Sequence, residues 1–270
     1  MGKEVSLIDK ALRAAADQVQ QVADVGGHKM RKLLGAATLV ALAVGASPSM
    51  AQVGSGVYFR VDAGAGFGTN TTFADTAPLS PSSTLGEVTL NGDAGTSVLG
   101  SAGIGVRLSP AFRVDVTASY MPDLRFSGQD SIGVGSIATA KIKPRVGLVN
   151  AYVDFGGLAG LPLSSAQPYL VASLGASRNQ LDDINTTAPG LPPFHTIKGR
   201  TTTQLAWGLG AGIGFPLGRF VTFDVMYKYL DLGRMETSGV LTLNGTTTQA
   251  TPIAADLHVH TVTVGFRVGF

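Results

Sequence analysis

The chain has 270 residues, 44% of them hydrophobic and only 14% charged, with 36 glycines and no cysteine. So apolar a composition excludes a largely disordered chain, and the missing cysteines exclude disulfides, thiolate nucleophiles and cysteine-based metal sites. The net charge of +2 comes from residues 1–51, which carry six Lys/Arg and four Asp/Glu, whereas the rest of the chain carries fourteen of each. No basic face of the kind that binds nucleic acid is indicated, so no nucleic-acid partner is expected.

Residues 30–51 have the three parts of a secretory signal peptide. A positively charged start is followed by fourteen apolar residues, 33–46, and then by small residues before a cleavage site. Fourteen apolar residues are too few for a membrane-spanning helix, and a buried core helix is the alternative. We expect residues 52–270 to form the mature chain. Residues 1–29 are interpreted as lying before the true translation start, with a genuine N-terminal extension as the alternative.

After the signal peptide, the recurring pattern is an alternation of apolar residues with small or polar ones. Val57, Phe59 and Val61 share one face, for example, while Tyr58 and Arg60 share the other. A period of two over nine to eleven residues is typical of strands with two unlike faces, and about that length crosses a membrane. Eight segments have this pattern: 57–67, 98–108, 112–120, 142–155, 167–178, 204–215, 220–230 and 257–270.

One face of these segments is apolar and uncharged, as a lipid-facing surface requires, while the other is mostly Gly, Ala, Ser and Thr. The second face also carries charges of both signs, which are Arg60, Asp62, Arg113, Asp115, Asp154, Asp224, Lys228 and Arg267. Because an unpaired buried charge is costly, matched charges favour an enclosed lumen. A sheet in lipid cannot leave an edge unpaired. The pattern therefore predicts an all-β fold, an eight-stranded antiparallel up-and-down transmembrane β-barrel.

The eight charges are interpreted as a hydrogen-bonded plug, because eight strands leave room for side chains and little else. A narrow water path along the same charges is the alternative. We expect small and charged side chains inside and apolar side chains pointing at lipid. The segment 142–155 departs from this rule, because Val146 and Leu148 share the parity of Asn150 and Asp154. We therefore expect a bulge in this segment.

The connections between the predicted strands alternate between short and long, the asymmetry of periplasmic turns and extracellular loops. The long connections are 69–97, 122–141, 179–203 and 231–256. Binding residues concentrate in loops on a rigid scaffold, so we expect ligand contacts from these loops. Their candidate contact residues are Phe73, Asp123, Arg125, Phe126, Asp182, Asp183, Phe194 and Arg234.

The chain ends in alternating apolar side chains up to a terminal phenylalanine. This ending resembles the signal by which the barrel-assembly machinery recognises outer-membrane proteins, and its residues are Val264, Phe266, Val268 and Phe270. The glycine-containing phrases 150–156, 168–175 and 206–212 are similar to those of opacity-family and porin-family (OmpA-like) eight-stranded barrels. The resemblance covers residues 52–270. It implies an abundant bacterial outer-membrane protein whose loops act as antigens or adhesins.

The sequence has no strong catalytic or cofactor motif. The glycine-rich segments 64–68 and 208–214 lack the Lys and Ser/Thr of a phosphate loop and the helix of a dinucleotide site. His258 and His260 share the outward face of the last predicted strand, but no third metal ligand accompanies them. We therefore expect no enzyme activity, no metal and no cofactor.

The leading hypothesis is an integral outer-membrane protein with a structural and surface-contact role. Its wall would contact outer-membrane lipid, and its loops would bind a host or envelope ligand. A narrow passive pore for small solutes or apolar molecules is the alternative, and an enzymatic role on lipid A ranks third.

Overall fold

The computed structural model describes residues 56–76, 89–130, 136–160, 166–187, 195–243 and 245–269. The predicted N-terminal extension (1–29) and the predicted signal peptide (30–51) lie outside these ranges. Two residues that the sequence singled out, Phe194 and Phe270, lie outside them as well.

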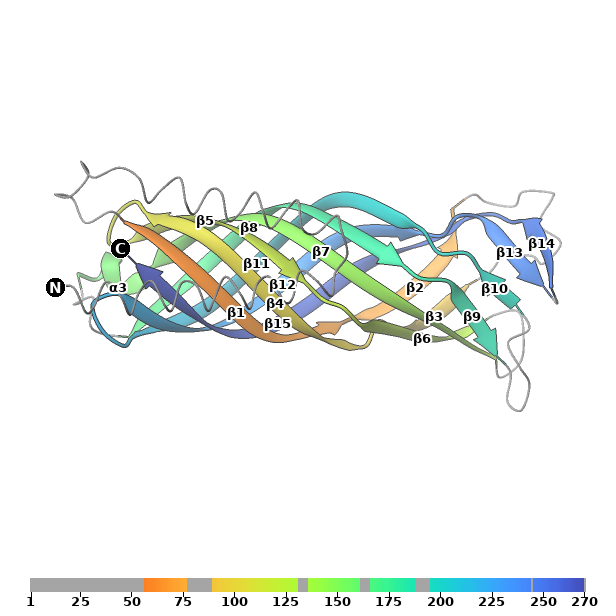
Figure 1. The fold of residues 1–270 in the computed structure, drawn as a ribbon, viewed down its shortest axis with the longest axis horizontal. Helices are drawn as coiled ribbons and strands as arrows, with labels where there is room; N and C mark the ends of the chain where they lie inside the picture. The colour runs from red at the N-terminus through yellow and green to blue at the C-terminus, as the bar shows by residue number, and fades with distance from the viewer. Residues whose placement is uncertain are drawn as a thin grey trace, which may run out of the picture. The chain divides into compact units, whose positions relative to one another are not determined.

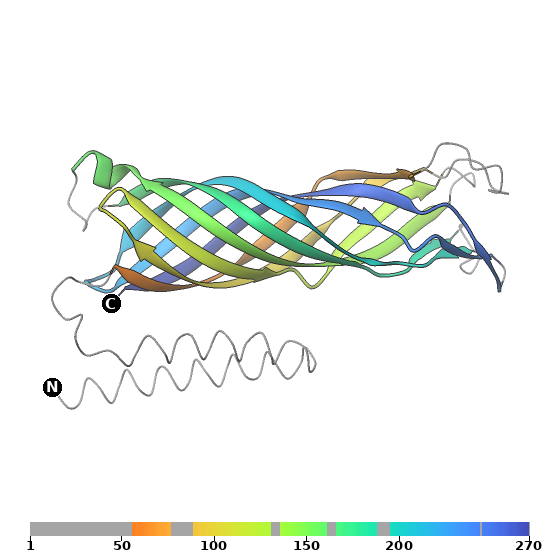
Figure 2. The ribbon, with the colours of Figure 1, turned by 90° about the horizontal axis from the view of Figure 1, so that it is seen from above.

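Eight long strands follow one another around a closed sheet (Figures 1 and 2). They are β1 (Val57–Gly68), β4 (Thr96–Arg107), β5 (Phe112–Tyr120), β7 (Ile137–Asp154), β8 (Gln167–Leu181), β11 (Thr201–Pro216), β12 (Val221–Glu236) and β15 (Ile253–Gly269). Each pairs antiparallel with the strands before and after it, and β15 pairs with β1 to close the ring. The predicted eight-stranded up-and-down barrel is confirmed.

The register of the pairs defines the stagger of the barrel. Paired residues followed once around the ring from Phe59 on β1 lead to His258 on β15. The backbone oxygen of His258 accepts a hydrogen bond of 3.1 Å from the amide of Thr69. The path thus returns at Thr69, just past the end of β1 and ten residues beyond Phe59, and this offset of ten residues is the shear of the barrel. An interior of this size is filled by side chains.

Side chains alternate between the two faces of the wall as the sequence pattern predicts. On β15, Val262, Val264 and Phe266 point outward and are about half exposed, whereas Thr261 and Thr263, which alternate with them, are buried. Outward aromatic side chains stand toward both ends of the strands; those that are exposed include Phe67, Phe112, Trp207, Phe215, Phe220 and Tyr227. The outward face is thus an apolar band edged by aromatic residues, which suits a bilayer and its two interfaces.

The long connections were expected to be loops, and this expectation is wrong for much of their length. Seven further strands continue the wall beyond the ring: β2 (Asn70–Asp75), β3 (Leu90–Asp93), β6 (Leu124–Asp130), β9 (Ile184–Thr187), β10 (His195–Ile197), β13 (Val240–Leu243) and β14 (Thr246–Gln249). β3 pairs with both β2 and β6, and β6 pairs with β7. Threonine, common in these segments, favours strands as well as turns, which is why composition alone did not reveal them.

The interior has two layers, and only one of them matches the expectation of small and charged side chains. Toward the long connections the barrel encloses an apolar core, which includes Leu99, Leu124, Leu148 and Leu230. Phe73 and Phe126, predicted to be surface contacts, belong to this core, with ring centroids 5.1 Å apart and planes at 79°. They are buried because β2 and β6 turn their apolar faces inward. The part of the wall beyond the ring, which we call the extension, therefore has a hydrophobic core of its own.

The apolar layer also explains why the predicted bulge in 142–155 is absent. β7 pairs without a register shift with β5 and β8, and both Val146 and Leu148 point inward at 3% exposure. Their neighbours inside are apolar, so the strand has no reason to change face. A register shift occurs instead between Asp231 and Arg234 on β12, where Gly233 has a φ of 74°. That left-handed conformation suits glycine and marks the irregularity.

The opposite end of the barrel has short connections. Between β4 and β5 the Ser109 hydroxyl accepts hydrogen bonds from the amides of Ala111 and Phe112, at 3.2 and 3.1 Å. β7 is followed by the single helical turn α3 (Phe155–Leu158). Among the described residues, no helix has the length and hydropathy that crossing a membrane requires.

Candidate functional site

The lower layer of the interior, toward the short turns, is a polar network. Its first part is built on Arg60 from β1, which is 2% exposed. The Arg60 guanidinium donates to both oxygens of Asp62, at 2.8 and 2.9 Å, and to Asp115 Oδ2 at 3.3 Å. Arg60 also donates to the Tyr152 hydroxyl, and Tyr58 donates to Asp115 Oδ2 at 3.0 Å. One cation is thus shared by two carboxylates, one from β1 and one from β5, which are separated in the ring by β4.

Asn150 on β7 links this cluster to the opposite wall. Its Nδ2 donates to Asp115 Oδ1 at 2.6 Å and to Thr117 Oγ1 at 2.9 Å. Its Oδ1 accepts from Lys228 Nζ at 2.9 Å and from Ser173 Oγ at 2.6 Å. The fully buried amide therefore uses both ends to connect strands on two sides of the lumen.

A second cluster surrounds Asp154 at the end of β7. The carboxylate accepts from Arg113 Nε at 3.1 Å and forms an ion pair with Arg107 Nη1 at 3.1 Å. The guanidinium carbon of Arg113 lies 3.9 Å from the ring centroid of Tyr152 and 4.5 Å from that of Tyr169. Among the described residues, none accepts a hydrogen bond from the two terminal nitrogens of Arg113. The two rings hold this cation in the lumen through their π faces.

The remaining predicted pair closes the network beside the seam of the barrel. Arg267 on β15 donates from Nε to Asp224 Oδ2 on β12 at 2.5 Å, and from Nη2 to Asp224 Oδ1 at 3.2 Å. This two-point contact ties together strands that are also paired through their backbones. Bidentate arginine–carboxylate contacts are among the strongest polar interactions in a protein, so this pair fixes the local register.

The structure places all eight predicted lumenal charges in the interior and joins seven of them in ion pairs, with Lys228 held by Asn150. Sequence reasoning missed the uncharged partners and one further arginine: Tyr58, Arg107, Asn150, Tyr152, Tyr169 and Ser173. The one signal in the sequence was that each occupies an alternate strand position that faces the lumen. Such a position does not show whether the side chain binds a charged neighbour or only fills space.

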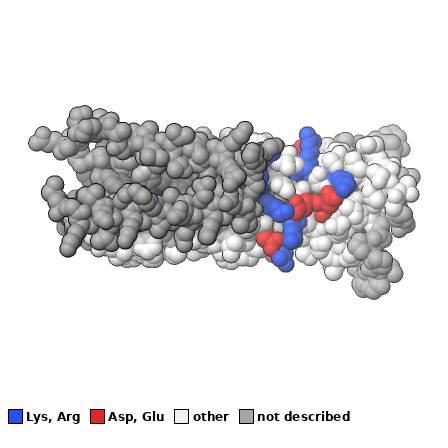
Figure 3. Space-filling view, viewed as in Figure 1, with Lys and Arg blue, Asp and Glu red and all other residues white. Residues whose placement is uncertain are grey.

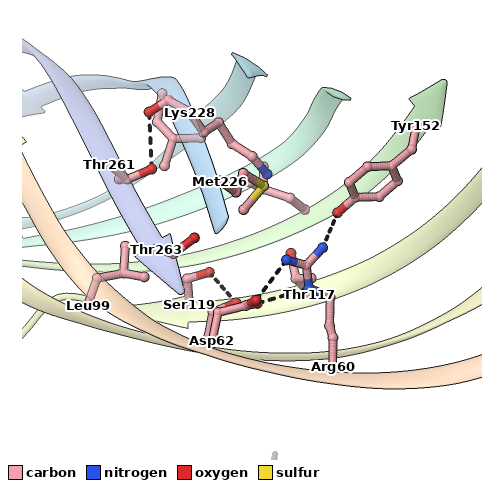
Figure 4. A pocket seen from close by; sticks show the side chains of 13 residues that line it. Arg60, Asp62, Leu99, Thr117, Ser119, Tyr152, Met226, Lys228, Thr261 and Thr263 are labelled. Atoms are coloured by element: carbon pink, nitrogen blue, oxygen red, sulfur yellow. Dashed lines mark hydrogen bonds and ion pairs between the residues drawn. The ribbon is translucent and has the colours of Figure 1, made fainter. Parts of the chain in front are cut away.

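A cavity of about 20 Å³ lies between the polar network and the apolar core, with room for about one water molecule. Figure 4 shows Arg60 turned toward Asp62 and Tyr152 on one side of it, with Lys228 and Met226 on the other. The lumen is therefore packed at this level, and the arrangement favours the plug over the water path.

Figure 3 shows a band of charged side chains of both signs that crosses the outer surface of the barrel. Most are paired across strands or within a turn. Arg125 and Lys141 contact Asp123 at 2.6 and 3.8 Å. The other pairs are Lys143–Asp182 at 2.5 Å, Lys198–Asp183 at 2.9 Å and Arg200–Glu236 at 3.7 Å. Of the predicted loop residues, Asp123, Arg125, Asp182 and Asp183 thus belong to this band and Arg234 is exposed, whereas the two phenylalanines that the structure describes are buried.

The two histidines lie on the outward face of β15, as their parity predicts. His258 Nε2 is 3.6 Å from Asp231 Oδ2, and His260 Nδ1 is 2.6 Å from the Tyr227 hydroxyl. Trp207 Nε1 donates to Asp231 Oδ2 at 3.1 Å. Within the described part of the chain, no three His, Cys, Asp or Glu side chains gather as a metal ion would require. The cluster has the composition of an interfacial aromatic belt.

The expected assembly signal lies on β15. Val264, Phe266 and Val268 face outward and stay partly exposed, while Phe270 lies outside the described residues. These residues flank the β15–β1 seam, where Val61 faces Phe266 and Phe59 faces Val268.

Comparisons with known proteins agree with this architecture. A family model described as outer membrane protein beta-barrel domain matches residues 36–270. The outer membrane protein PagN of Salmonella typhimurium is 25% identical over 203 residues, which cover 70% of this chain and 79% of that protein. The crystal structure of OprG from Pseudomonas aeruginosa is similar, with a TM-score of 0.52 and 13% identity, over 80% of this chain and 98% of that one. Neisserial surface protein A is 19% identical over 80% of this chain and 98% of that one, with a TM-score of 0.42.

Proposed function

Because the chain belongs to the outer membrane protein beta-barrel domain family and lies in the outer membrane, we propose that it is a non-enzymatic surface-contact protein. In this proposal the barrel anchors the protein in the bilayer. The strands that continue outward present a rigid surface to a ligand of the host or of the neighbouring envelope.

The observation that carries the proposal is the length of the strands. β7 has 18 residues, β15 has 17 and β12 has 16, whereas about 9–11 residues cross a membrane. The extra length continues past the apolar band and encloses its own buried core, in which Phe73 and Ile253 are almost fully buried. A barrel that served only as an anchor needs no such extension. A packed extension holds its surface residues in place, which favours specific contact.

The extension offers two kinds of surface. The charged band displays exposed cations, among them Arg125, Lys141, Lys198 and Arg200, whose side chains are each more than half exposed. Beyond it, the β13–β14 hairpin is uncharged, and all four residues of β14 are exposed. Side chains of both kinds would meet a partner outside the cell before any part of the lumen does.

The narrow passive pore is the alternative, and the packing of the interior weighs against it. A solute would have to pass Arg60, Asn150 and Arg113, each buried and engaged with several partners. It would then have to cross the apolar core above them. Passage would require both layers to open.

The test removes most of the extension, namely the outer part of β7 and all of β2, β3, β6, β9, β10, β13 and β14, and keeps the barrel. Four backbone hydrogen bonds close the outer ends of the strands: Gly68 N to Gly95 O at 2.7 Å, Met121 N to Pro144 O at 3.1 Å, Leu181 N to Arg200 O at 3.0 Å and Thr237 N to Ile253 O at 3.0 Å. Joining each pair by a two-residue Asn-Gly turn gives a shortened barrel.

Cells that display the shortened barrel should lose binding to host cells, extracellular matrix or envelope fractions that the full chain binds. A matched variant with residues 157–160 replaced by Gly-Ser repeats alters the opposite end and should bind normally. Both variants must migrate as folded on unheated gels. Full binding by the shortened barrel would contradict the proposal, whether or not the shortened barrel also conducts ions.

A further inference from the structure

Two arginines stand directly opposite each other on the outward face of the barrel. Arg145 on β7 pairs in register with Arg178 on β8, and both side chains are exposed. Residues directly opposite in an antiparallel pair have Cβ atoms about 5 Å apart, and like charges in that position are unfavourable. An anion bound between the two side chains would offset this repulsion.

No carboxylate of the described residues forms an ion pair with either arginine. Asp182, the acidic residue nearest to Arg178 in sequence, is already engaged by Lys143 at 2.5 Å, and Asp123 is engaged by Arg125 at 2.6 Å. Arg145 lies over the Tyr120 ring, with its guanidinium carbon 5.6 Å from the centroid. This contact orients the arginine and leaves its charge without compensation.

The pair marks the level at which the outward surface changes from apolar to charged. Two residues further out, the paired positions are Lys143 and Gln180. Toward the short turns the paired positions are Gly147 and Ala176, followed by Val149 and Leu174, which are 57% and 58% exposed. Lipid phosphate groups lie at this kind of boundary, with their acyl chains on the apolar side.

The surface just below the pair is flat and open. Ala118, Gly147 and Ala176 lie side by side on three adjacent strands, and a Cβ atom on Gly147 would meet nothing within 4 Å. An acyl chain has unobstructed access to this surface directly beneath the two guanidinium groups.

We propose that Arg145 and Arg178 together bind a phosphate group of the phosphorylated glycolipid of the outer leaflet, lipid A. The outward position at the extracellular edge of the apolar band places the pair in that leaflet. Guanidinium groups present planar pairs of donors that match phosphate oxygens, so two of them hold one dianionic group from two sides. Acyl chains of the same molecule lie along the small residues below.

The test measures lipid retention by the purified full chain in detergent, by native mass spectrometry with added bisphosphorylated lipid A. The Arg145→Gln/Arg178→Gln variant should bind lipid A about tenfold more weakly or worse. Arg178→Lys, which keeps the charge and loses the planar donors, should lie between the two. The matched control is Lys198→Gln/Arg200→Gln, which removes two cations elsewhere on the exposed surface and should bind like the unmodified chain.

Two further arms identify the occupant. Inorganic phosphate should not displace lipid A, and phosphatidylglycerol should bind more weakly. Equal retention by the Arg145→Gln/Arg178→Gln variant would overturn the site, as would an equal loss in the Lys198→Gln/Arg200→Gln control. Phosphatidylglycerol that binds as tightly as lipid A would overturn the assignment of the occupant. All variants are compared as folded protein, identified by migration without heating, and if the double variant does not fold, Arg178→Lys decides.

Discussion

Asn150 is the uncharged residue on which the lumenal network depends. Its amide bridges Asp115 and Lys228, so that an acidic and a basic side chain on different strands share one neutral partner. Charged side chains in a sealed interior are costly unless every donor and acceptor is used. A neutral amide provides both a donor and an acceptor to these charged side chains without adding a further charge to the lumen.

Replacing Asn150 by Ala should lower the free energy of unfolding by about 2 kcal/mol or more, because Asp115, Ser173 and Lys228 each lose a buried partner. The measurement is the urea midpoint of the folded protein in detergent. Thr203→Ala on the exposed outward face is the control, and equal midpoints for the two variants would contradict this role.

Asp154 gives a sharper comparison, because its two arginines differ in burial. The Arg113 side chain is fully buried and that of Arg107 is 28% exposed. Asp154→Asn should cost about 3–5 kcal/mol, since it leaves a buried cation without its anion. Arg107→Gln should cost about 1 kcal/mol or less, because water already screens that pair. Unfolding curves of the two variants decide, and comparable losses would rule out this difference.

Asp183 in the charged band predicts a pH effect. Burial alone would raise the pKa of this carboxyl. Hydrogen bonds from Lys198 Nζ at 2.9 Å and from the Gly199 amide at 3.0 Å, together with the Lys198 charge, outweigh burial and hold the pKa below its ordinary value. The pair therefore contributes stability at neutral pH that is lost as the pH falls through this lowered pKa.

Lys198→Gln should raise the pKa of Asp183, and carboxyl carbon NMR titration measures it. Arg125→Gln is the control, because Arg125 contacts Asp123 instead. An unchanged pKa in the Lys198→Gln variant would show that another group holds the carboxylate.

At the scale of the strand, alternation was a reliable guide and composition was not. The eight predicted segments coincide with the eight ring strands within a few residues at the ends facing the short turns. The outer ends were underestimated, because Thr- and Gly-rich sequence is common to loops and to the small strands β9, β13 and β14. Val146 and Leu148 illustrate the same limit, since a face that is polar at one level and apolar at another cannot be read from parity alone.

The interior network was accessible from sequence only in part. Parity put Arg60 and Asp115 on the inner face, but nothing in the chain says that one hydroxyl of Tyr152 or one amide of Asn150 completes their contacts. Those pairings depend on the shear of the ring, which sets the level at which residues of β5, β7 and β12 meet inside the lumen. Shear is a property of the closed sheet and has no local sequence signal.

The last strand yields a prediction about assembly. Phe266 packs against Phe223 of β12, with ring centroids 5.5 Å apart. The outward side chains of β15 lie beside the seam between β15 and β1. Deleting Phe270 should reduce the folded protein in the outer membrane, because the proposed recognition by the assembly machinery would lose its terminal residue. Heat-modifiable protein in membrane fractions is the readout, with Leu217→Ala in the β11–β12 turn as control. Unchanged amounts would refute the signal.

The whole molecule combines two folding solutions along one wall. The lower part has a polar interior and an apolar exterior, as a bilayer requires, and the upper part has the apolar core of a water-soluble sheet protein. The same strands pass through both parts, so the membrane anchor and the exposed surface are one rigid unit. This continuity links the buried network to the proposed surface contact, because loosening the lower ring would also disturb the upper one.

Closure of the ring between the first and last strands is the claim on which this account depends. The chain has no cysteine, so paired cysteines report proximity without background. Ala65 and Val262 face each other across the β1–β15 seam, and facing residues lie within the Cα range of a disulfide. Ala65→Cys/Val262→Cys should oxidise to an intramolecular disulfide in outer-membrane fractions, whereas Ala65→Cys/Leu209→Cys, with strands β12 and β15 between the two cysteines, should not. No crosslink at the seam, or equal crosslinking in both variants, would contradict a closed barrel.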